Sequence, residues 1–202
     1  MARQRLMWRW ALLLAGLVLL AGCSGMRIVD SDVQAYSANQ GVSVPAAYRF
    51  ERLPSQQNRG EAQQRLEAIV QAELAKVGLQ RNDANARYSV AFELRMARDP
   101  RAPWDDPPYW GGMHHGVVVT RSGTVVHVPM VALQFDTPYY RREVQLLVRR
   151  LSDGVLVFES RANHDGRWSD DEAVLPAMFE AALHGFPNPP QGLRRVNVEI
   201  PR

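Results

Sequence analysis

The residue types that do chemistry in proteins are concentrated between Asp99 and Gly116 of this sequence. The prolines and paired glycines of this stretch predict an irregular loop, and loops carry function more often than core elements do. The loop contains carboxylates, adjacent histidines and aromatic side chains: Asp105, Asp106, His114, His115, Trp104, Tyr109 and Trp110. These side chains form the candidate site.

One hypothesis is a metal or small-ligand site built from His114, His115 and either Asp105 or Asp106. Neutral imidazole and carboxylate groups are suitable ligands for Zn²⁺ and similar ions. Adjacent histidines rarely point the same way, however, and the sequence has no helical His-x3-His pair and no cysteine partner for them. We therefore predict no metal and no cofactor, and keep a ligand or metal binder as the alternative.

A second hypothesis is that Trp104, Tyr109 and Trp110 anchor a partner protein, as aromatic side chains do at many interfaces. The plainest alternative is that these rings fold over one end of a sheet and have a structural role only. Common catalytic motifs are absent: there is no Gly-x-Ser-x-Gly, no His-Glu-x-x-His, no P-loop and no Gly-x-Gly-x-x-Gly after a strand. We therefore expect a binding protein and not an enzyme, with an unrecognised hydrolase as a second alternative.

The remaining histidines have ordinary structural explanations. We expect His127 on a strand, His164 in a turn, and His184 in the last turn of a helix, where a cation suits the helix dipole. Two arginine pairs, Arg141-Arg142 and Arg149-Arg150, flank one predicted strand. They are expected to lie on a solvated face, although clustered arginines on a tethered protein can also contact anionic head groups.

Composition and charge exclude several classes of protein. The chain has 202 residues, 46% of them hydrophobic and 22% charged, which is typical of one globular domain. Its single cysteine excludes an internal disulfide. The basic excess is confined to Arg3, Arg5 and Arg9, so the chain from residue 23 onward is formally neutral. Nucleic acid binding by bulk charge is therefore not expected.

Residues 1–22 have the features of a targeting segment. The three N-terminal arginines precede an uncharged apolar run, Ala11 to Ala21, which is too short to span a membrane. The run ends in Leu20-Ala21-Gly22-Cys23, which resembles the lipobox of bacterial lipoproteins. The resemblance implies cleavage before Cys23 and attachment of acyl chains, which would hold the protein on a membrane.

Ser24 follows the cysteine, whereas lipoproteins of the inner membrane commonly carry Asp there. The similarity therefore favours the outer membrane, with the domain in the periplasm. The alternative is an ordinary secretory signal in which Cys23 is incidental.

Hydrophobic periodicity then predicts the elements that position these residues. Two helices are expected, over 61–77 and from Ser169 to Gly185. Asn58 with Glu61 and Ser169 with Glu172 would cap their starts, and Gly78 and Gly185 would end them. Strands are expected at 26–37, 48–51, 88–96, 141–151, 155–162 and 196–198. A further hairpin is expected from 117–124, with a second arm that reaches about residue 135.

This order of elements predicts an α+β fold over residues 23–202. An antiparallel-rich β-sheet with two amphipathic helices packed on one face would bury both helical stripes. The irregular loop at 99–116 would project from this single domain.

The succession of motifs resembles small bacterial lipoproteins of domain-of-unknown-function family 4136 over residues 26–190. The motifs that carry the resemblance are the lipobox, Tyr48-Arg49-Phe50, the helix ending near Gly78, Ala86-Arg87-Tyr88-Ser89-Val90, the Gly154 hairpin and Gly185-Phe186-Pro187. The segment 99–135 is richer in Pro, Trp and His than the family core. The resemblance implies an envelope lipoprotein of undefined role and carries over no catalytic residues.

Overall fold

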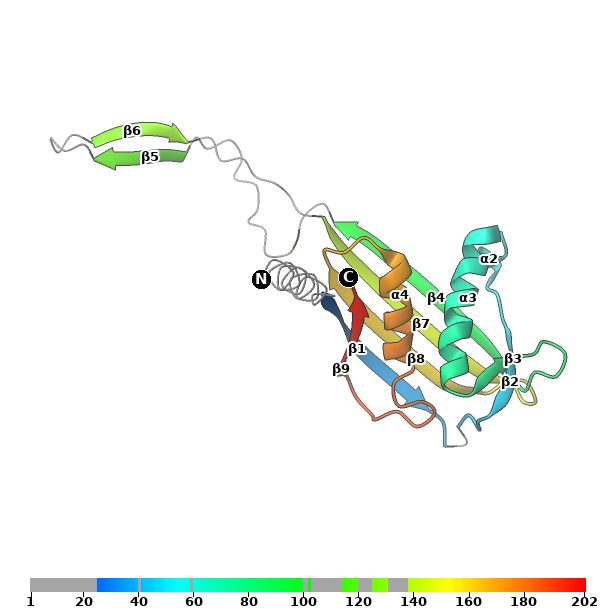
Figure 1. The fold of residues 1–202 in the computed structure, drawn as a ribbon. Helices are drawn as coiled ribbons and strands as arrows, with labels where there is room; N and C mark the ends of the chain where they lie inside the picture. Colours follow the sequence, from blue (N-terminus) through cyan, green and yellow to red (C-terminus); the bar gives the residue numbers. More distant parts are fainter. Residues whose placement is uncertain are drawn as a thin grey trace, which may run out of the picture.

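A seven-stranded mixed sheet with helices on one of its faces forms the body of the molecule in the computed structural model (Figure 1). The structure describes residues 25–39, 41–58, 60–99, 102, 114–119, 125–130 and 138–202, with the backbone alone described for 114–119 and 125–130. Within these ranges, no helix is both long and apolar enough to cross a membrane. The predicted α+β class is confirmed, and most strand pairs of the sheet are antiparallel.

The order of the strands in the sheet is β3-β2-β4-β7-β8-β1-β9. Short β2 runs parallel to β3 and to β4, and every other neighbouring pair of this sheet is antiparallel. The bounds are β1 (Met26–Ser37), β2 (Ala46–Phe50), β3 (Leu79–Arg81), β4 (Tyr88–Asp99), β7 (Tyr139–Arg150), β8 (Leu156–Gly166) and β9 (Arg194–Pro201). The hairpin expected after residue 117 is also present, as β5 (His114–Val119) paired with β6 (Val125–Met130).

Side chains alternate across the sheet because successive residues of a strand point to opposite faces. In β1 the odd-numbered residues from Arg27 to Ala35 are buried, and in β7 the even-numbered residues from Arg142 to Val148 are buried. The buried set packs against the helices. The opposite set remains at least partly exposed, so the sheet has one covered face and one open face.

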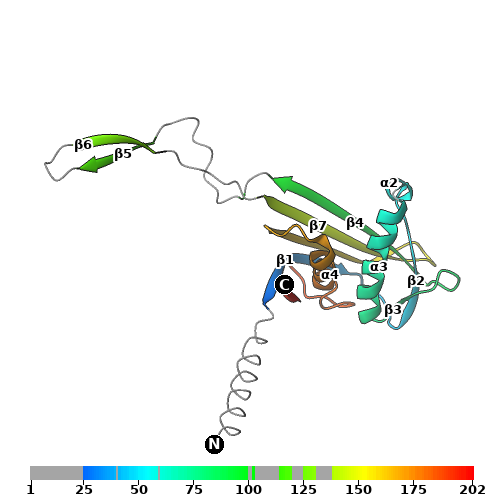
Figure 2. The ribbon, with the colours of Figure 1, turned by 45° about the horizontal axis from the view of Figure 1, so that its top comes forward.

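The helices are α2 (Pro54–Gln57), α3 (Gly60–Lys76) and α4 (Asp171–Ala182). Figures 1 and 2 show α3 and α4 over the same face of the sheet, as the two apolar stripes predict. Phe179 of α4 is fully buried and meets Phe92 of β4 edge to face, with ring centroids 6.0 Å apart. Gly78 and Gly185 follow the two long helices with φ of 86° and 80°, a conformation that glycine adopts without steric cost.

Both predicted N-terminal caps differ from the structure. The residue that caps α4 is Asp170, and it makes no side-chain capping bond; its carbonyl accepts the N–H of Val174. Asn58 instead closes the short helix α2. Helix α2 and strand β3 were not predicted, because four and three residues are too few to establish a hydrophobic period.

Candidate binding site on the open face of the sheet

The open face carries two rows of mostly polar side chains that cross the middle of the sheet. Strand register places Ala97, Arg141 and Asp165 side by side in the first row. The next row begins with Arg95 and Glu143 and continues through Asn163 and Asp32. The rows line a hollow of about 420 Å³, whose walls come from β1, β4, β7 and β8. Distant parts of the chain therefore build one concave polar surface.

The arginines of this hollow are paired with carboxylates on the same face. Arg141 Nη2 lies 2.6 Å from Asp99 Oδ2, and Arg95 Nε lies 3.0 Å from Glu93 Oε1. Arg161 Nε lies 3.0 Å from Glu143 Oε1. Such exposed pairs contribute little to stability, because water and salt screen them. Charged groups of a partner can therefore replace these pairs at little cost.

Tyr139 is linked to the hollow through Asp165, which lines it. Its side chain is buried, and it hydrogen-bonds the carboxylate of Asp165. Burial, reinforced by this hydrogen bond, raises the pKa of Tyr139 to about 12. The phenol is therefore protonated at physiological pH. In this state it holds Asp165 in position and is not a nucleophile.

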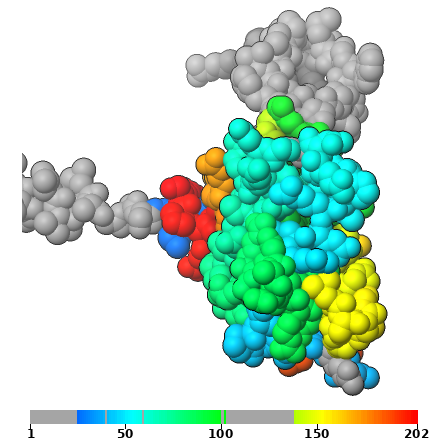
Figure 3. Space-filling model, turned by 90° about the vertical axis from the view of Figure 1, so that its right-hand side faces the viewer, coloured from blue at the N-terminus to red at the C-terminus, as the bar shows by residue number. Residues whose placement is uncertain are grey.

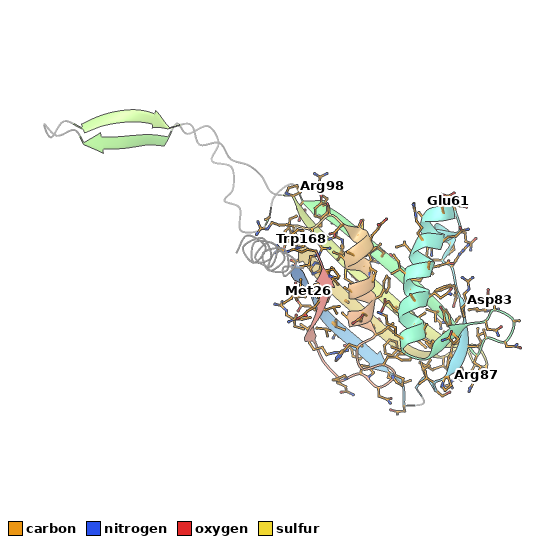
Figure 4. All side chains as sticks on the ribbon, in the orientation of Figure 1. Met26, Glu61, Asp83, Arg87, Arg98 and Trp168 are labelled. Atoms are coloured by element: carbon orange, nitrogen blue, oxygen red, sulfur yellow. The ribbon has the colours of Figure 1, made fainter. Side chains whose placement is uncertain are left out.

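The segment predicted to carry function, 99–116, begins beside this hollow, and the chain rejoins the sheet there at Tyr139. Asp99 ends β4, Tyr139 begins β7, and the two residues are register partners. Figure 4 labels Arg98, which lies at the same end of β4. Residues 100–138 are therefore inserted between the paired ends of two central strands of the sheet.

Most of the predicted site residues lie outside the residues that the structure describes: Cys23, Trp104, Asp105, Asp106, Tyr109 and Trp110. The backbones of His114 and His115 are described and lie in β5, opposite Met130 and Pro129. Strand β5 thus begins at His114, two residues before residue 116, where the loop was expected to end. The structure does not describe the side chains of this hairpin, His127 included. No group of three or more His, Cys, Asp or Glu side chains in the described ranges is suited to hold a metal ion.

The covered face contains a cluster of buried basic residues that the sequence analysis missed. Arg142 was expected in solvent, yet only 3% of it is exposed, and it faces the helices. Its register partner on β8 is His164, which was expected in a turn and is instead a buried strand residue. These two predictions were wrong because both residues continue the buried alternation of their strands.

This cluster fixes the start of α4 against the sheet. Arg142 Nε donates to Asp171 Oδ1 at 2.8 Å, and its Nη2 donates to the carbonyl of Trp168, also at 2.8 Å. Arg27 of β1 binds both carboxylate oxygens of Asp170 and stacks on the Trp168 ring. The Arg27 hydrogen bonds lower the pKa of Asp170. The cluster therefore has a structural role, which Figure 4 shows at Trp168 beside the start of α4.

Other expected charges behave as surface groups. Arg149 donates to the carbonyl of Gly154, and Arg150 pairs with Asp153, so both close the β7–β8 turn. His184 lies beyond the end of α4, and its carbonyl accepts a hydrogen bond from Arg194. Neither arginine pair forms a continuous basic surface.

Comparison with known proteins identifies a family and a fold. No curated protein matches the sequence. The structure is similar to a crystal structure of a PDZ domain protein from Parabacteroides distasonis, with a TM-score of 0.51 and 14% identity. That alignment covers 87% of this chain but only 39% of the other, so this chain spans well under half of that protein. A PelC dodecamer from Paraburkholderia phytofirmans matches with a TM-score of 0.43 and 12% identity, over 76% of this chain and 95% of that one.

The similarity to the PDZ domain protein concerns the fold alone, because the identity is low. The sequence model of DUF4136, a domain of unknown function, matches residues 30–188. This range extends from β1 to the segment that follows α4 and therefore includes both long helices and most of the sheet. The chain belongs to the DUF4136 family.

Proposed function

We propose that this protein is a lipid-anchored binding module of the cell envelope that recognises another envelope protein and catalyses no reaction. The observation that carries the proposal is the register pair Asp99 and Tyr139. It attaches the segment containing Trp104, Tyr109 and Trp110 to the paired ends of two central sheet strands, beside a polar hollow. Loops mounted on rigid scaffolds are common recognition elements, and aromatic side chains are common anchors in them.

The chemistry of the open face favours binding over catalysis. An active site commonly contains a base or nucleophile whose pKa is moved toward neutrality. The phenol beside the hollow has its pKa moved in the opposite direction, to about 12. Arg95, Arg141 and Arg161 are each paired with a carboxylate, and these exposed pairs suit exchange with a partner's charges.

The envelope location rests on the N-terminal sequence. The lipobox-like segment ends at Cys23, and β1 begins only three residues later, at Met26. An extended tether of three residues spans about 10 Å. Acylation of Cys23 would therefore hold the start of β1, and with it the paired end of β9, close to the bilayer.

The direct test is photo-crosslinking in cells of the native host. A photoreactive residue replaces Trp104, Tyr109 or Trp110 in the full-length protein, and Glu172 on α4 serves as the exposed control. We expect a discrete protein adduct from the loop positions and none from the control. Absence of an adduct, at normal expression and membrane fractionation, would make the loop a structural cap and overturn this proposal.

Metal analysis of the purified protein tests the metal-binding alternative. Stoichiometric metal that copurifies with the parent protein and is lost in the double variant His114→Ala, His115→Ala would support a ligand or metal binder. We expect equal and substoichiometric metal in both proteins.

A further inference from the structure

Strand β9 is the outermost strand on one side of the sheet, and its only strand partner in the described part of the chain is β1. The N–H of Arg202 donates to the carbonyl of Gly25 on the β1 side. Backbone direction alternates along a strand, so the N–H and C=O groups of Arg195, Asn197 and Glu199 point away from β1. These groups form an open edge that a further strand can pair with.

This edge lacks three features that commonly prevent pairing between molecules. Proteins commonly protect edge strands by short length, a bulge or proline. The opposite edge strand, β3, has only three residues, whereas β9 has eight and no proline before Pro201. The register of β9 with β1 is continuous over its whole length. Strand β9 is therefore the edge of this sheet that is suited to pairing.

Apolar side chains are exposed along the same border. Leu193, next to β9, is 70% exposed, and Met26 and Ile28 on β1 are 52% and 55% exposed. Val196 and Val198 of β9 are only partly buried against the core. Figure 3 shows β9 (red) beside β1 (blue) at the border of the described body, and Figure 4 labels Met26 there. A strand added at this edge would cover apolar surface as well as backbone.

The sequence of β9 is complementary to itself when two copies run antiparallel. If Asn197 lies opposite Asn197 of a second copy, Arg195 lies opposite Glu199, and Val196 lies opposite Val198. Opposite charges then meet on the open face, and valines meet on the helix side. The outward-pointing residues also coincide, so they form the hydrogen-bonded pairs of the new ladder.

From this edge and its self-complementary sequence, we propose that the partner of β9 is a second copy of this chain. The two copies form a symmetric dimer in which the sheets join edge to edge, with the helices of both copies on the same face. A two-fold axis through the paired Asn197 residues relates the copies, as in most soluble homodimers. Arg195 is available for the new pair because its contact with Asp32, at 3.1 Å, is an exposed ion pair.

Thiol crosslinking of the full-length protein in native membranes tests the interface. The variant Asn197→Cys places a thiol beside the two-fold axis, and Asp83→Cys, in the exposed loop after β3, is the control. A short bismaleimide is expected to give a dimer with Asn197→Cys, above the level of the parent protein, and none with Asp83→Cys. A product of any other mass, or no dimer above the parent, would overturn the proposal.

Charge exchange provides the specific test in the Asn197→Cys background. Glu199→Arg places arginines opposite each other at two symmetric positions, and the dimer yield should fall about tenfold. Adding Arg195→Glu restores opposite charges, and the yield should return to within about twofold of its starting value. Both side chains are exposed, so neither substitution disturbs the core. If the dimer yield is unchanged by Glu199→Arg, or if Arg195→Glu fails to restore it, this register is contradicted.

Discussion

Asp99 and Tyr139 lie directly opposite each other across the β4–β7 ladder, although 39 residues separate them in the chain. The long insertion between them therefore starts and ends at a single point of the sheet. In addition, Arg141 pairs with Asp99 at 2.6 Å, which ties the two strands together at this point. The two strands are thus held together at the point where the insertion leaves the sheet.

The first prediction concerns the independence of the body from this insertion. Replacing residues 100–138 by Asn-Gly joins Asp99 to Tyr139 through a two-residue hairpin turn, which suits adjacent antiparallel strands. We expect the shortened protein to unfold cooperatively, with a Tm within about 5 °C of the parent. Thermal circular dichroism measures this, and a loss of cooperativity would show that the insertion belongs to the core.

Arg142 and its neighbour Arg141 offer a matched pair for the second prediction. Arg142→Ala removes a buried cation and leaves Asp171 and the Trp168 carbonyl without their donor. The free energy of unfolding should fall by about 2–3 kcal/mol. Arg141→Ala removes an exposed ion pair one residue away and should cost less than about 1 kcal/mol. Urea denaturation of both variants decides the matter: equal losses would show that burial of Arg142 is unimportant.

The contrast between these arginines also shows how far the sequence could predict the site. The alternation of Val144, Leu146 and Val148 correctly predicted β7 and already places Arg142 on the buried face. The charge of Arg142 led us to expect exposure, whereas its even-numbered position on the strand correctly indicates burial. The same reasoning applies to His164, which continues the buried alternation of β8.

The partners of these residues could not be predicted from local pattern. Asp170 and Asp171 reach Arg27 and Arg142 only because α4 packs across β1 and β7, which are distant from each other in the sequence. The rows of the open face likewise depend on register between strands that are distant in sequence. Periodicity predicts which face a side chain occupies, but it contains no information about the neighbouring strand.

The third prediction uses the buried carboxylate of Glu67 on α3. Arg52 Nε donates to Glu67 Oε1 at 2.6 Å, and its Nη2 donates to Oε2 at 3.0 Å. These hydrogen bonds lower the pKa of Glu67 despite its burial, which acts in the opposite direction. The ionised carboxylate therefore stabilises the folded state fully above the ordinary glutamate pKa of about 4.3. This stabilisation is lost as the pH falls through the lower folded-state value.

Urea denaturation between pH 3 and pH 7 tests this assignment. The parent protein should lose stability on acidification, and Glu67→Gln should lose less over the same range, because it has no carboxylate to protonate there. Glu172→Gln, on the exposed start of α4, is the matched control, because this carboxylate is exposed to solvent. If Glu67→Gln and the parent share one pH profile, the Arg52 contact does not set the acid stability.

The fourth prediction concerns the anchor, and it can fail without affecting the fold. Cys23→Ala removes the only thiol of the chain, and with it the only position to which a lipobox-dependent thioether can attach. We expect the variant to leave the membrane fraction, because the acyl chains supply the binding energy and the described body has no membrane-spanning helix.

The informative comparison is Ser24→Asp, which leaves Cys23 intact. It should keep the protein on membranes but move it toward the inner membrane in a density gradient. A Cys23→Ala protein that fractionates with the parent would show that Cys23 is incidental and that another feature of the chain holds it at the membrane.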